Sequence, residues 1–303
     1  MAKPLLISVQ GPTASGKTKV AIELAQWLET EILSCDSRQF YKELKIGAAP
    51  PSMQELAQVK HHFIQNKSIE QDYNAGKFET EAVAFLASFF QTHPAIIMVG
   101  GSGLYANAVI HGFDELPELN ETIRQSLLDE FNLKGIEFLQ NELQQLDPDY
   151  FNIVDHKNPH RLIRALEIIQ STGKKMSQIR TNQLKQRPFR VLNFIMDWPR
   201  KELYERINKR VDLMMSQGLL EEVMSLKEYA HLQPLNTVGY KELFLHLNGE
   251  LELSEAIELI KRNSRRYAKR QITWYKKQEN INWVHPDKLD EIKNIILKEI
   301  KIQ

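Results

Sequence analysis

Cysteine is almost absent from this chain, which has Cys35 alone among its 303 residues. A single cysteine excludes an intrachain disulfide and a cysteine-rich zinc module, so a reducing compartment is expected. No apolar run approaches the roughly 18 residues of a membrane-spanning helix, and residues 5–9 are too short for a signal peptide. Thirteen glycines and twelve prolines are too few for a collagen-like or low-complexity chain. We therefore expect a globular protein of the cytoplasm.

Net charge is also lacking, because 39 lysines and arginines balance 39 aspartates and glutamates. The balance is uneven along the chain. Residues 1–150 carry 11 basic and 20 acidic residues, whereas residues 151–303 carry 28 and 19. Such asymmetry is typical of a nucleic-acid or membrane surface on one part of a chain. The overall charge of zero therefore does not exclude a nucleic-acid partner.

Short apolar runs alternate with amphipathic segments, which favours an α/β fold with a parallel sheet flanked by helices. The predicted strands are residues 5–9, 31–34, 95–99, 190–196 and 281–284. From residue 121 to about 181 the periodicity is helical only. We therefore predict an α/β core of residues 1–113 and 190–303, interrupted by an all-helical insertion domain of residues 114–189.

The first predicted strand leads into the motif G-x-x-x-x-G-K-[ST], which reads Gly11-Pro12-Thr13-Ala14-Ser15-Gly16-Lys17-Thr18. Its glycines let backbone N–H groups point at phosphate oxygens, and the next helix presents its positive dipole end. Lys17 adds a mobile cation, and the Thr18 hydroxyl suits a Mg²⁺ ion that bridges phosphates. The sequence therefore predicts a phosphate loop in a P-loop NTPase-like core.

A nucleotide hydrolase or kinase usually adds an apolar strand that ends in an aspartate and helps to hold Mg²⁺. The best-placed strand here leads instead into Gly100-Gly101-Ser102-Gly103, and the rival carboxylate, Asp197, lies beyond the predicted insertion. This pattern weakens the hydrolase interpretation and leaves it open.

Two further strand ends carry polar side chains, because Asp36 follows the strand at 31–34 and Ser102 follows the strand at 95–99. Ligands bind at this edge of open α/β sheets. We therefore expect a phosphate cradle, a carboxylate and a hydroxyl to converge in one crevice. Asp36 and Ser102 each have a structural alternative as a helix N-cap. Cys35 is interpreted as a buried strand thiol, since no histidine lies nearby in sequence.

Six motifs, in order along nearly the whole chain, resemble the tRNA dimethylallyltransferase family, also called tRNA isopentenyltransferases or IPP transferases. They are GPTASGKT at 11–18, DSRQFYK at 36–42, GGSGLY at 100–105, NPHRLIRALE at 158–167, VGYKE at 238–242 and AKRQITWY at 268–275. Only the first is common outside the family. The resemblance is to the short bacterial form, without the zinc finger of some eukaryotic members.

The resemblance implies transfer of a dimethylallyl group from dimethylallyl diphosphate to the exocyclic N6 of adenosine 37 in tRNA, beside the anticodon. It implies that the phosphate loop, Arg210 and Mg²⁺ bind the diphosphate. It further implies that Asp36 is the general base on the adenine amine, assisted by the Ser102 hydroxyl. The tRNA-binding positions that it implies are Asp36, Ser37, Arg38, Gln39, Ser102, Arg124, His160, Arg161, Leu162, Ile163 and Arg164. Ser102 stands where the family often has threonine, and His160 where it often has glutamine or arginine.

The basic residues of the second half fall into two clusters. Residues 160–210 hold 13 basic and four acidic residues, and residues 261–277 hold eight basic residues and no acidic one. Lysine and arginine neutralise phosphates, and aromatic rings can stack on unpaired bases. Lys269 and Arg270 of the second cluster are therefore expected to bind tRNA.

Aromatic residues interrupt the second cluster at Tyr267, Trp274 and Tyr275. Helical spacing predicts one charged stripe, opposite a packing face that includes Ile260, Tyr267 and Trp274. The charged stripe is formed by Arg262, Arg266 and Lys269. Core packing of the aromatics and a merely solvated charged face are the structural alternatives.

Three other functions stay open: a prenyltransferase for free AMP, ADP or ATP, a P-loop small-molecule kinase that uses ATP, and a tRNA-binding factor with a vestigial phosphate loop. The helical insertion and the basic second half favour tRNA over a mononucleotide. The intact Lys17, Thr18 and Asp36 argue against a vestigial loop. A monomer is expected, because no unassigned apolar stripe requires a partner.

Overall fold

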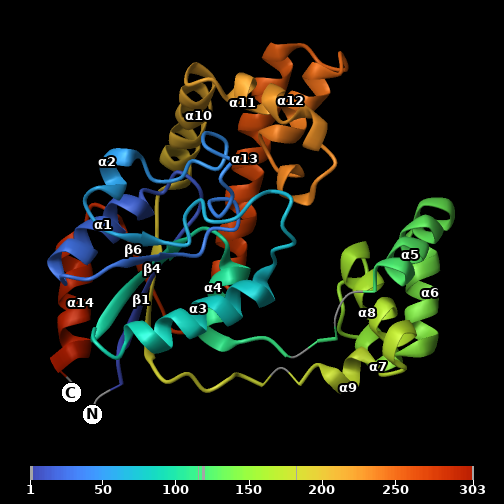
Figure 1. Ribbon diagram of the computed structural model, residues 1–303, viewed down its shortest axis with the longest axis horizontal. Helices are drawn as coiled ribbons and strands as arrows, with labels where there is room; N and C mark the ends of the chain where they lie inside the picture. Colours follow the sequence, from blue (N-terminus) through green and yellow to red (C-terminus); the bar gives the residue numbers. More distant parts are fainter. Residues whose placement is uncertain (1–2, 115, 118–119, 182, 302–303) are drawn as a thin grey trace. The chain divides into compact units, whose positions relative to one another are not determined.

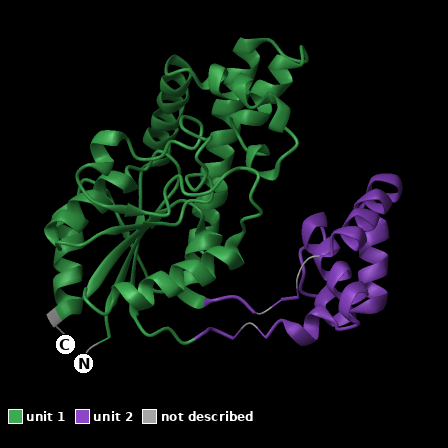
Figure 2. Ribbon diagram, in the orientation of Figure 1, with its two compact units in different colours: residues 1–111, 186–303 green, residues 112–185 purple. Residues whose placement is uncertain are grey.

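The computed structural model describes residues 3–114, 116–117, 120–181 and 183–301. The chain divides into two compact units (Figure 2). Unit 1 comprises residues 1–111 and 186–303, and unit 2 comprises residues 112–185. Each unit has its own hydrophobic core, and they are described separately.

Unit 1 is built on a six-stranded parallel sheet with the order β3-β2-β4-β1-β5-β6. The strands are β1 (Leu5–Gln10), β2 (Ile32–Ser34), β3 (His61–His62), β4 (Ala95–Gly100), β5 (Arg190–Met196) and β6 (Ile281–Val284). Both central strands β1 and β4 are buried along their whole length, as expected for a sheet that is covered on both faces. The predicted P-loop NTPase-like fold class is confirmed.

Alternate residues of β1 serve two separate cores. Leu5, Ile7 and Val9 pack with α1 (Lys17–Trp27) and α14 (Leu289–Lys301) on one face of the sheet. Leu6 packs on the opposite face with α3 (Ala75–Phe89) and α4 (Gly103–His111). Figure 1 shows the two pairs of helices on either side of the strands. The loops at the carboxyl ends of β1, β2 and β4 therefore meet at one edge of a rigid sheet.

A helical lobe completes unit 1 around a third apolar core, which includes Leu44, Leu219, Tyr240 and Ile260. The lobe consists of α10 (Arg200–Ser216), α11 (Leu219–Ser225), α12 (Tyr240–Leu247) and α13 (Leu253–Tyr275), with 3-10 turns η1 (Lys227–Tyr229) and η2 (Gln233–Leu235). The short helix α2 (Met53–Leu56) follows the loop after β2. Since Tyr41 and Leu44 belong to the third core, that loop is anchored on the lobe.

All of the regular secondary structure described in unit 2 is helical. Its helices are α5 (Glu121–Lys134), α6 (Ile136–Leu146), α7 (Pro148–Phe151), α8 (Pro159–Thr172) and α9 (Met176–Ile179). Leu127, Leu139, Leu143 and Leu166 lie in its core. The expected insertion ended at residue 189, whereas unit 2 ends at residue 185. The difference arises because Phe189 is buried in the sheet core of unit 1.

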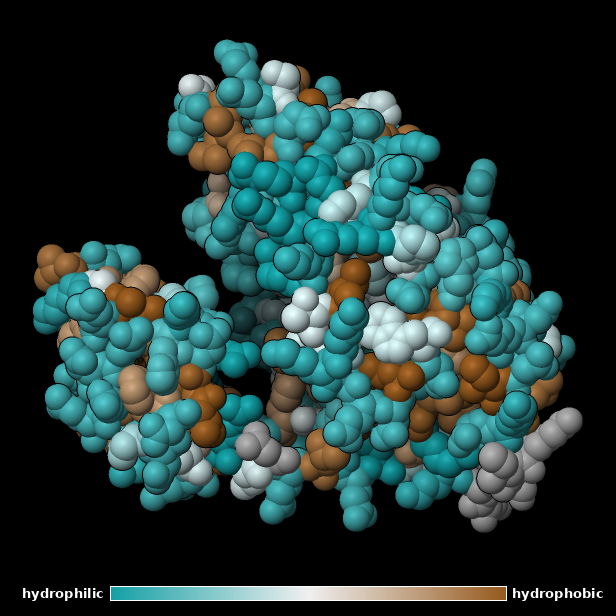
Figure 3. Space-filling model, turned by 180° about the vertical axis from the view of Figure 1, so that it is seen from behind, coloured by the Kyte–Doolittle hydropathy of each residue, from teal (hydrophilic) through white to brown (hydrophobic). Residues whose placement is uncertain are grey.

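No helix in the described ranges is long and apolar enough to cross a membrane. Hydrophilic side chains cover most of the face shown in Figure 3, and apolar side chains are scattered between them.

Candidate active site

The phosphate loop runs from Gly11 to Gly16 between β1 and α1. Ala14 and Gly16 have positive φ angles of 63° and 81°, so the backbone curls back before the helix. A Cβ atom on Gly11 would lie 2.8 Å from Ser15 Oγ, which explains the glycine there. No side chain caps α1. The N–H groups of Lys17 and Thr18 therefore have no acceptor among the described residues and are available to an anion.

Three distant side chains hold the outside of this loop. Trp198 Nε1 donates to Ser15 O at 2.8 Å, and Arg206 Nε donates to Ala14 O at 2.8 Å. Thr13 N donates to Gln271 Oε1 at 3.1 Å. The Arg206 guanidinium also lies 4.4 Å from the centre of the Trp198 ring. Sequence reasoning did not find these three supports.

Lys17 Nζ lies against its own loop, 3.4 Å from Pro12 O. Burial, opposed by Asp36 and assisted by the nearby Arg210, lowers the pKa of Lys17 from its ordinary value to about 8. Burial also lowers the pKa of Arg210, and the carboxylates of Asp36 and Glu55 oppose this shift. Arg210 makes no hydrogen bond or ion pair with a described residue. Two desolvated cations therefore share the surroundings of one carboxylate, as a site for a multivalent anion requires.

Asp36 lies just past the carboxyl end of β2. Its Oδ1 accepts a hydrogen bond from Arg38 N at 3.1 Å, and the segment forms turns, so the helix N-cap alternative is not realised. Its Oδ2 is 3.5 Å from the position that a Cβ atom on Gly101 would occupy. No described residue donates a hydrogen bond to Oδ2. One carboxylate oxygen thus orients the turn and the other faces the second glycine loop.

Ser102 links that second loop to the Asp36 turn. Its backbone oxygen occupies the N-cap position of α4, accepting from Ala106 N at 3.1 Å. Its hydroxyl instead accepts from Ser37 N at 2.9 Å and donates to Ser37 Oγ at 3.0 Å. The backbone therefore begins the helix while the hydroxyl bonds to the turn that carries Asp36. Its connection to Asp36 passes through Ser37 rather than through a direct hydrogen bond.

Cys35 and Asp197 are the two remaining side chains that the sequence raised as candidates. Cys35 is fully buried and its pKa is raised by burial, so the structural thiol interpretation is confirmed. Its Sγ would lie 2.5 Å from a Cβ atom on Gly100, which explains that glycine. Asp197 is exposed after β5, and its carboxylate makes no hydrogen bond with a described residue of the phosphate loop.

Other predicted tRNA contacts in unit 1 differ in how free their side chains are. Gln39 Nε2 already donates to Ala49 O at 2.9 Å, whereas the Arg38 guanidinium bonds to no described residue. Lys269 and Arg270 are exposed on α13. Arg270 Cζ lies 5.7 Å from the centre of the Tyr267 ring.

The predicted packing face of α13 is partly wrong. Ile260 is buried at 2 % exposure, as predicted, but Tyr267 is 38 % exposed. The buried side chains of the carboxyl-terminal half are Ala268, Gln271 and Tyr275, which lie over the two loops of the site. Tyr267 lies one turn before Gln271 on the same side of α13, at a point where that side is exposed to solvent.

In unit 2, two predicted tRNA-binding arginines also have a structural partner. Arg124 and Arg164 contact opposite oxygens of the fully buried Glu167, at 3.3 and 3.0 Å. Asn120 N donates to the same carboxylate at 2.8 Å. Glu167 thus ties α5 to α8, and both guanidinium groups remain partly exposed.

The remaining predicted tRNA-binding residues lie at the start of α8, where two are exposed and two are buried. Asn158 caps this helix by accepting from Arg161 N at 3.3 Å, and His160 and Arg161 are exposed. Leu162 and Ile163 are 0 % and 1 % exposed in the core of unit 2. Helical periodicity turns these two side chains inward, so a tRNA contact at either position would have to be made by the backbone.

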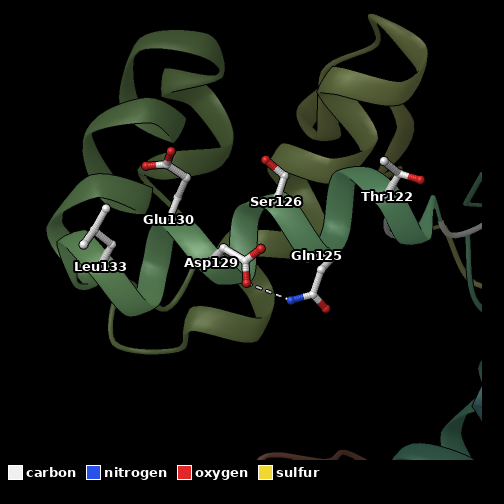
Figure 4. Close-up of a pocket in the computed structure, with 6 residues that line it drawn as sticks. All are labelled: Thr122, Gln125, Ser126, Asp129, Glu130 and Leu133. Carbon is white, nitrogen blue, oxygen red and sulfur yellow. Dashed lines mark hydrogen bonds between the residues drawn. The ribbon is translucent and has the colours of Figure 1, made fainter.

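A hollow on the surface of α5 differs in charge from the site at the strand ends. Its six lining residues, shown in Figure 4, come from one face of that helix: Thr122, Gln125, Ser126, Asp129, Glu130 and Leu133. Gln125 Nε2 donates to Asp129 Oδ1 at 2.8 Å within it. With two carboxylates and no cation in its lining, it does not suit a phosphate group.

A phosphate loop, a strand-end carboxylate and a helical insertion define a P-loop α/β protein whose candidate site lies at the carboxyl edge of the sheet. The IPP transferase family profile matches residues 39–278, and the chain belongs to this family. The resemblance found in the sequence is thus confirmed.

Relatives of known name match over nearly the whole chain. The protein is 48% identical to tRNA dimethylallyltransferase 1 of Bacteroides thetaiotaomicron over 289 residues, which cover 95% of this chain and 94% of that protein. The structure of full-length tRNA isopentenylpyrophosphate transferase from Bacillus halodurans is 35% identical, with a TM-score of 0.74 and coverage of 99% and 97%. A eukaryotic dimethylallyltransferase acting on tRNA is 26% identical, with a TM-score of 0.80 and coverage of 99% and 79%.

Proposed function

We propose that the protein is a tRNA dimethylallyltransferase, which moves a dimethylallyl group from dimethylallyl diphosphate to N6 of adenosine 37 in tRNA. The observation that carries the proposal is the meeting of a phosphate loop with the Asp36 carboxylate across Gly101. Relatives named tRNA dimethylallyltransferase that are 48% and 45% identical support it. The products are diphosphate and N6-(dimethylallyl)adenosine. They arise in one displacement, in which the C–O bond to diphosphate breaks and a C–N bond to the adenine amine forms.

The site has a donor half, formed by the phosphate loop, Lys17 and Arg210, and an acceptor half, formed by Asp36, Ser37 and Ser102. The donor half stabilises the leaving diphosphate. The free N–H groups of the phosphate loop, Lys17 and Arg210 would neutralise the charge that develops as the C–O bond breaks. Lys17 and Arg210 are both desolvated, so their interaction with an anion is stronger than at an exposed surface.

Mg²⁺ fits this half when bound together with the diphosphate. Thr18 opens α1 and its hydroxyl makes no hydrogen bond with a described residue, so it is free to be a ligand. The described residues contain no group of three or more His, Cys, Asp or Glu side chains that could hold a metal on their own. Mg²⁺ usually keeps few protein ligands beside substrate phosphates and supplies charge neutralisation there.

The acceptor half activates a weak nucleophile. The adenine amine lone pair is delocalised into the ring, so the amine needs a base as the C–N bond forms. Asp36 Oδ2 has no hydrogen-bond donor from a described residue and is free to take one N6 proton. The Ser102–Ser37 hydrogen bonds hold the turn that presents this carboxylate. General-base assistance of this kind contributes about 10²–10⁴-fold.

The target base must leave its stack to reach Asp36, so we propose that adenosine 37 is extruded from the anticodon loop. The exposed Lys269 and Arg270 would contact the phosphate backbone beside the crevice, together with Arg38. In unit 2, the exposed His160 and Arg161 and the partly exposed Arg124 and Arg164 would bind the same tRNA. We propose that the enzyme acts as a monomer in the cytoplasm.

One assay tests this function against its alternatives. Purified protein is incubated with labelled dimethylallyl diphosphate and Mg²⁺, and with tRNA, AMP, ADP, ATP or no acceptor. The proposal expects label in tRNA alone. Label in a free nucleotide would support an adenylate prenyltransferase, and release of ADP from ATP would support a small-molecule kinase. Binding of tRNA without any transfer would indicate a non-catalytic factor.

A further inference from the structure

The side chain of Gln271 bridges the two glycine loops of the site. Its Oε1 accepts a hydrogen bond from Thr13 N of the phosphate loop at 3.1 Å. Its Nε2 donates to Gly101 O of the second loop at 2.8 Å. The side chain is 7% exposed, so both hydrogen bonds are shielded from water.

The surroundings of Gln271 are built for this bridge. Tyr275, one helical turn further along α13, donates from its hydroxyl to the same Gly101 O at 3.3 Å. A Cβ atom on Gly101 would lie 2.9 Å from Gln271 Nε2 and 3.5 Å from Asp36 Oδ2. Residue 101 must therefore lack a side chain for the carboxamide to approach, and the bridge lies beside the carboxylate of the acceptor half.

A carboxamide is suited to this place because it combines one acceptor and one donor group in a plane. By accepting from Thr13 N, it turns that amide away from the phosphates, while the amides of Lys17 and Thr18 stay free. By holding Gly101, it holds the loop whose Ser102 positions the Asp36 turn.

We propose that Gln271 is a positioning residue that sets the spacing between the donor phosphates and the acceptor base. This inference rests on the proposed transferase function for its effect on rate. Bond formation requires the amine and the allylic carbon to be held within van der Waals reach, and a misplacement of about 1 Å costs on the order of 10²-fold. Gln271 acts on the rate through the two loops that it joins.

Two variants of Gln271 and one control test the bridge. Gln271→Glu keeps the acceptor for Thr13 N but points an oxygen at Gly101 O, which pushes the loops apart. Gln271→Met keeps similar length and removes both hydrogen bonds. Thr273→Ala is the control, because Thr273 is exposed on the same helix and, among the described residues, its hydroxyl bonds only to Lys269 O.

We expect kcat to fall by about tenfold or more in both Gln271 variants, with KM for tRNA and for the donor changed by less than about threefold. The melting temperature of the control should match that of the wild type, and that of Gln271→Met should fall by only several degrees, since two buried hydrogen bonds are lost. Values of kcat within about twofold of the wild type would overturn the inference. So would a loss of donor binding in parallel with kcat at a temperature where the variant is folded, because that pattern indicates a structural role.

A second measurement is independent of activity. Inorganic pyrophosphate that binds the phosphate loop should slow backbone hydrogen exchange at residues 100–106 in the wild type. This protection should be lost in Gln271→Met while residues 11–18 remain protected. If protection of residues 100–106 persists in the variant, the bridge does not couple the loops. A wild-type enzyme that transfers no prenyl group would overturn the proposed function alone, since the exchange result still decides the role of Gln271.

Discussion

The Tyr240 hydroxyl donates a hydrogen bond to Glu222 Oε1 at 2.6 Å. The same carboxylate accepts from the backbone N–H groups of Lys45, Ile46 and Gly47 at 2.9, 2.7 and 3.0 Å. A Cβ atom on Gly47 would lie 2.5 Å from the Tyr240 ring, so the loop approaches the ring as closely as glycine permits. Burial and Glu222 raise the pKa of Tyr240, which stays protonated and donates throughout the accessible pH range. Glu222 thus fixes the segment that follows the Asp36 turn to the helical lobe.

Removing the Tyr240 hydroxyl should destabilise unit 1. Tyr240→Phe is expected to lower the free energy of unfolding by about 1–3 kcal/mol, because Glu222 loses a donor at a buried position. Urea unfolding measures this change. Tyr229→Phe is the control, since Tyr229 is 36% exposed on η1 and should change stability by less than about 0.5 kcal/mol. Equal effects of the two substitutions would contradict the anchoring role of the Tyr240 hydroxyl.

Replacing the carboxylate at position 36 should slow the chemical step. Asp36→Asn keeps an oxygen for Arg38 N and removes the basic oxygen, so the turn is preserved. We expect the single-turnover rate to fall by about 10²–10⁴-fold, with little change in the dissociation constant for tRNA. Ser37→Ala, which leaves the Ser102 bond to Ser37 N intact, should have a much smaller effect. A fall of less than about threefold in Asp36→Asn would show that the base is another group.

The pH dependence of diphosphate binding should report the charge of Lys17. In the free protein Lys17 loses its proton as the pH rises through about 8, which is below the ordinary lysine value. Binding of an anion requires the charged form. The dissociation constant for the donor should therefore be nearly constant below pH 8 and rise up to about tenfold per pH unit above it. Calorimetric titration from pH 6.5 to 9.5 measures this.

Arginine at position 17 supplies the control, because its charge persists across that range. Lys17→Arg should bind the donor with an affinity that is independent of pH between 8 and 9.5. The stability of the free wild type should rise between pH 8 and about 10.4, because the unfolded chain still binds the proton that the folded protein has lost. A wild-type affinity that is flat up to pH 9.5 would contradict the lowered pKa.

Salt should weaken tRNA binding far more than donor binding. Each phosphate contact by a lysine or arginine adds about −0.7 to −0.9 to the slope of log K against log salt. Lys269→Gln and Arg270→Gln should each make that slope shallower by about one contact, measured by filter binding from 50 to 300 mM salt. Lys288→Gln, on the 65% exposed Lys288 beside α14, should leave it unchanged. Unaltered slopes in all three variants would place the tRNA away from α13.

Glu167 should matter chiefly for the integrity of unit 2. Glu167→Gln removes the buried counter-charge of the partly exposed Arg124 and Arg164, which we expect to cost unit 2 about 3 kcal/mol. Hydrogen exchange should then accelerate over residues 112–185, while donor binding by unit 1 stays the same. The exposed Glu137 on α6 provides a matched control as Glu137→Gln. Normal protection of unit 2 in Glu167→Gln would contradict the structural role of this carboxylate.

The convergence of the phosphate loop, Asp36 and Ser102 was predictable, because carboxyl ends of neighbouring parallel strands meet at one edge. The strands β2, β4 and β1 are indeed neighbours. Strand β3 was missed, since its two residues, His61 and His62, carry no apolar pattern. Helical periodicity predicts the inward direction of Leu162 and Ile163, whereas the family motif does not distinguish its buried positions from its exposed ones.

The supports of the phosphate loop could not be predicted. Trp198, Arg206 and Gln271 lie from about 180 to 260 positions away in sequence, and no spacing rule relates them to a loop so distant. The exposure of Tyr267 has a similar origin, because the carboxyl-terminal half of α13 packs against α10 through Ala268 and also against the two glycine loops through Gln271 and Tyr275. Its buried side therefore follows the shape of the site more closely than the hydrophobic pattern.

The central position of β1 has a consequence for synthesis on the ribosome. Leu5 pairs with Ala95 on one side and with Arg190 on the other. Strand β1 emerges first, and its second neighbour, β5, is synthesised only after the whole of unit 2. During that interval it carries an apolar, unpaired edge, which is the kind of surface that aggregates or binds chaperones. Completion of the sheet around β1 is therefore a late, long-range step in folding, whereas the contacts of unit 2 are local and form early.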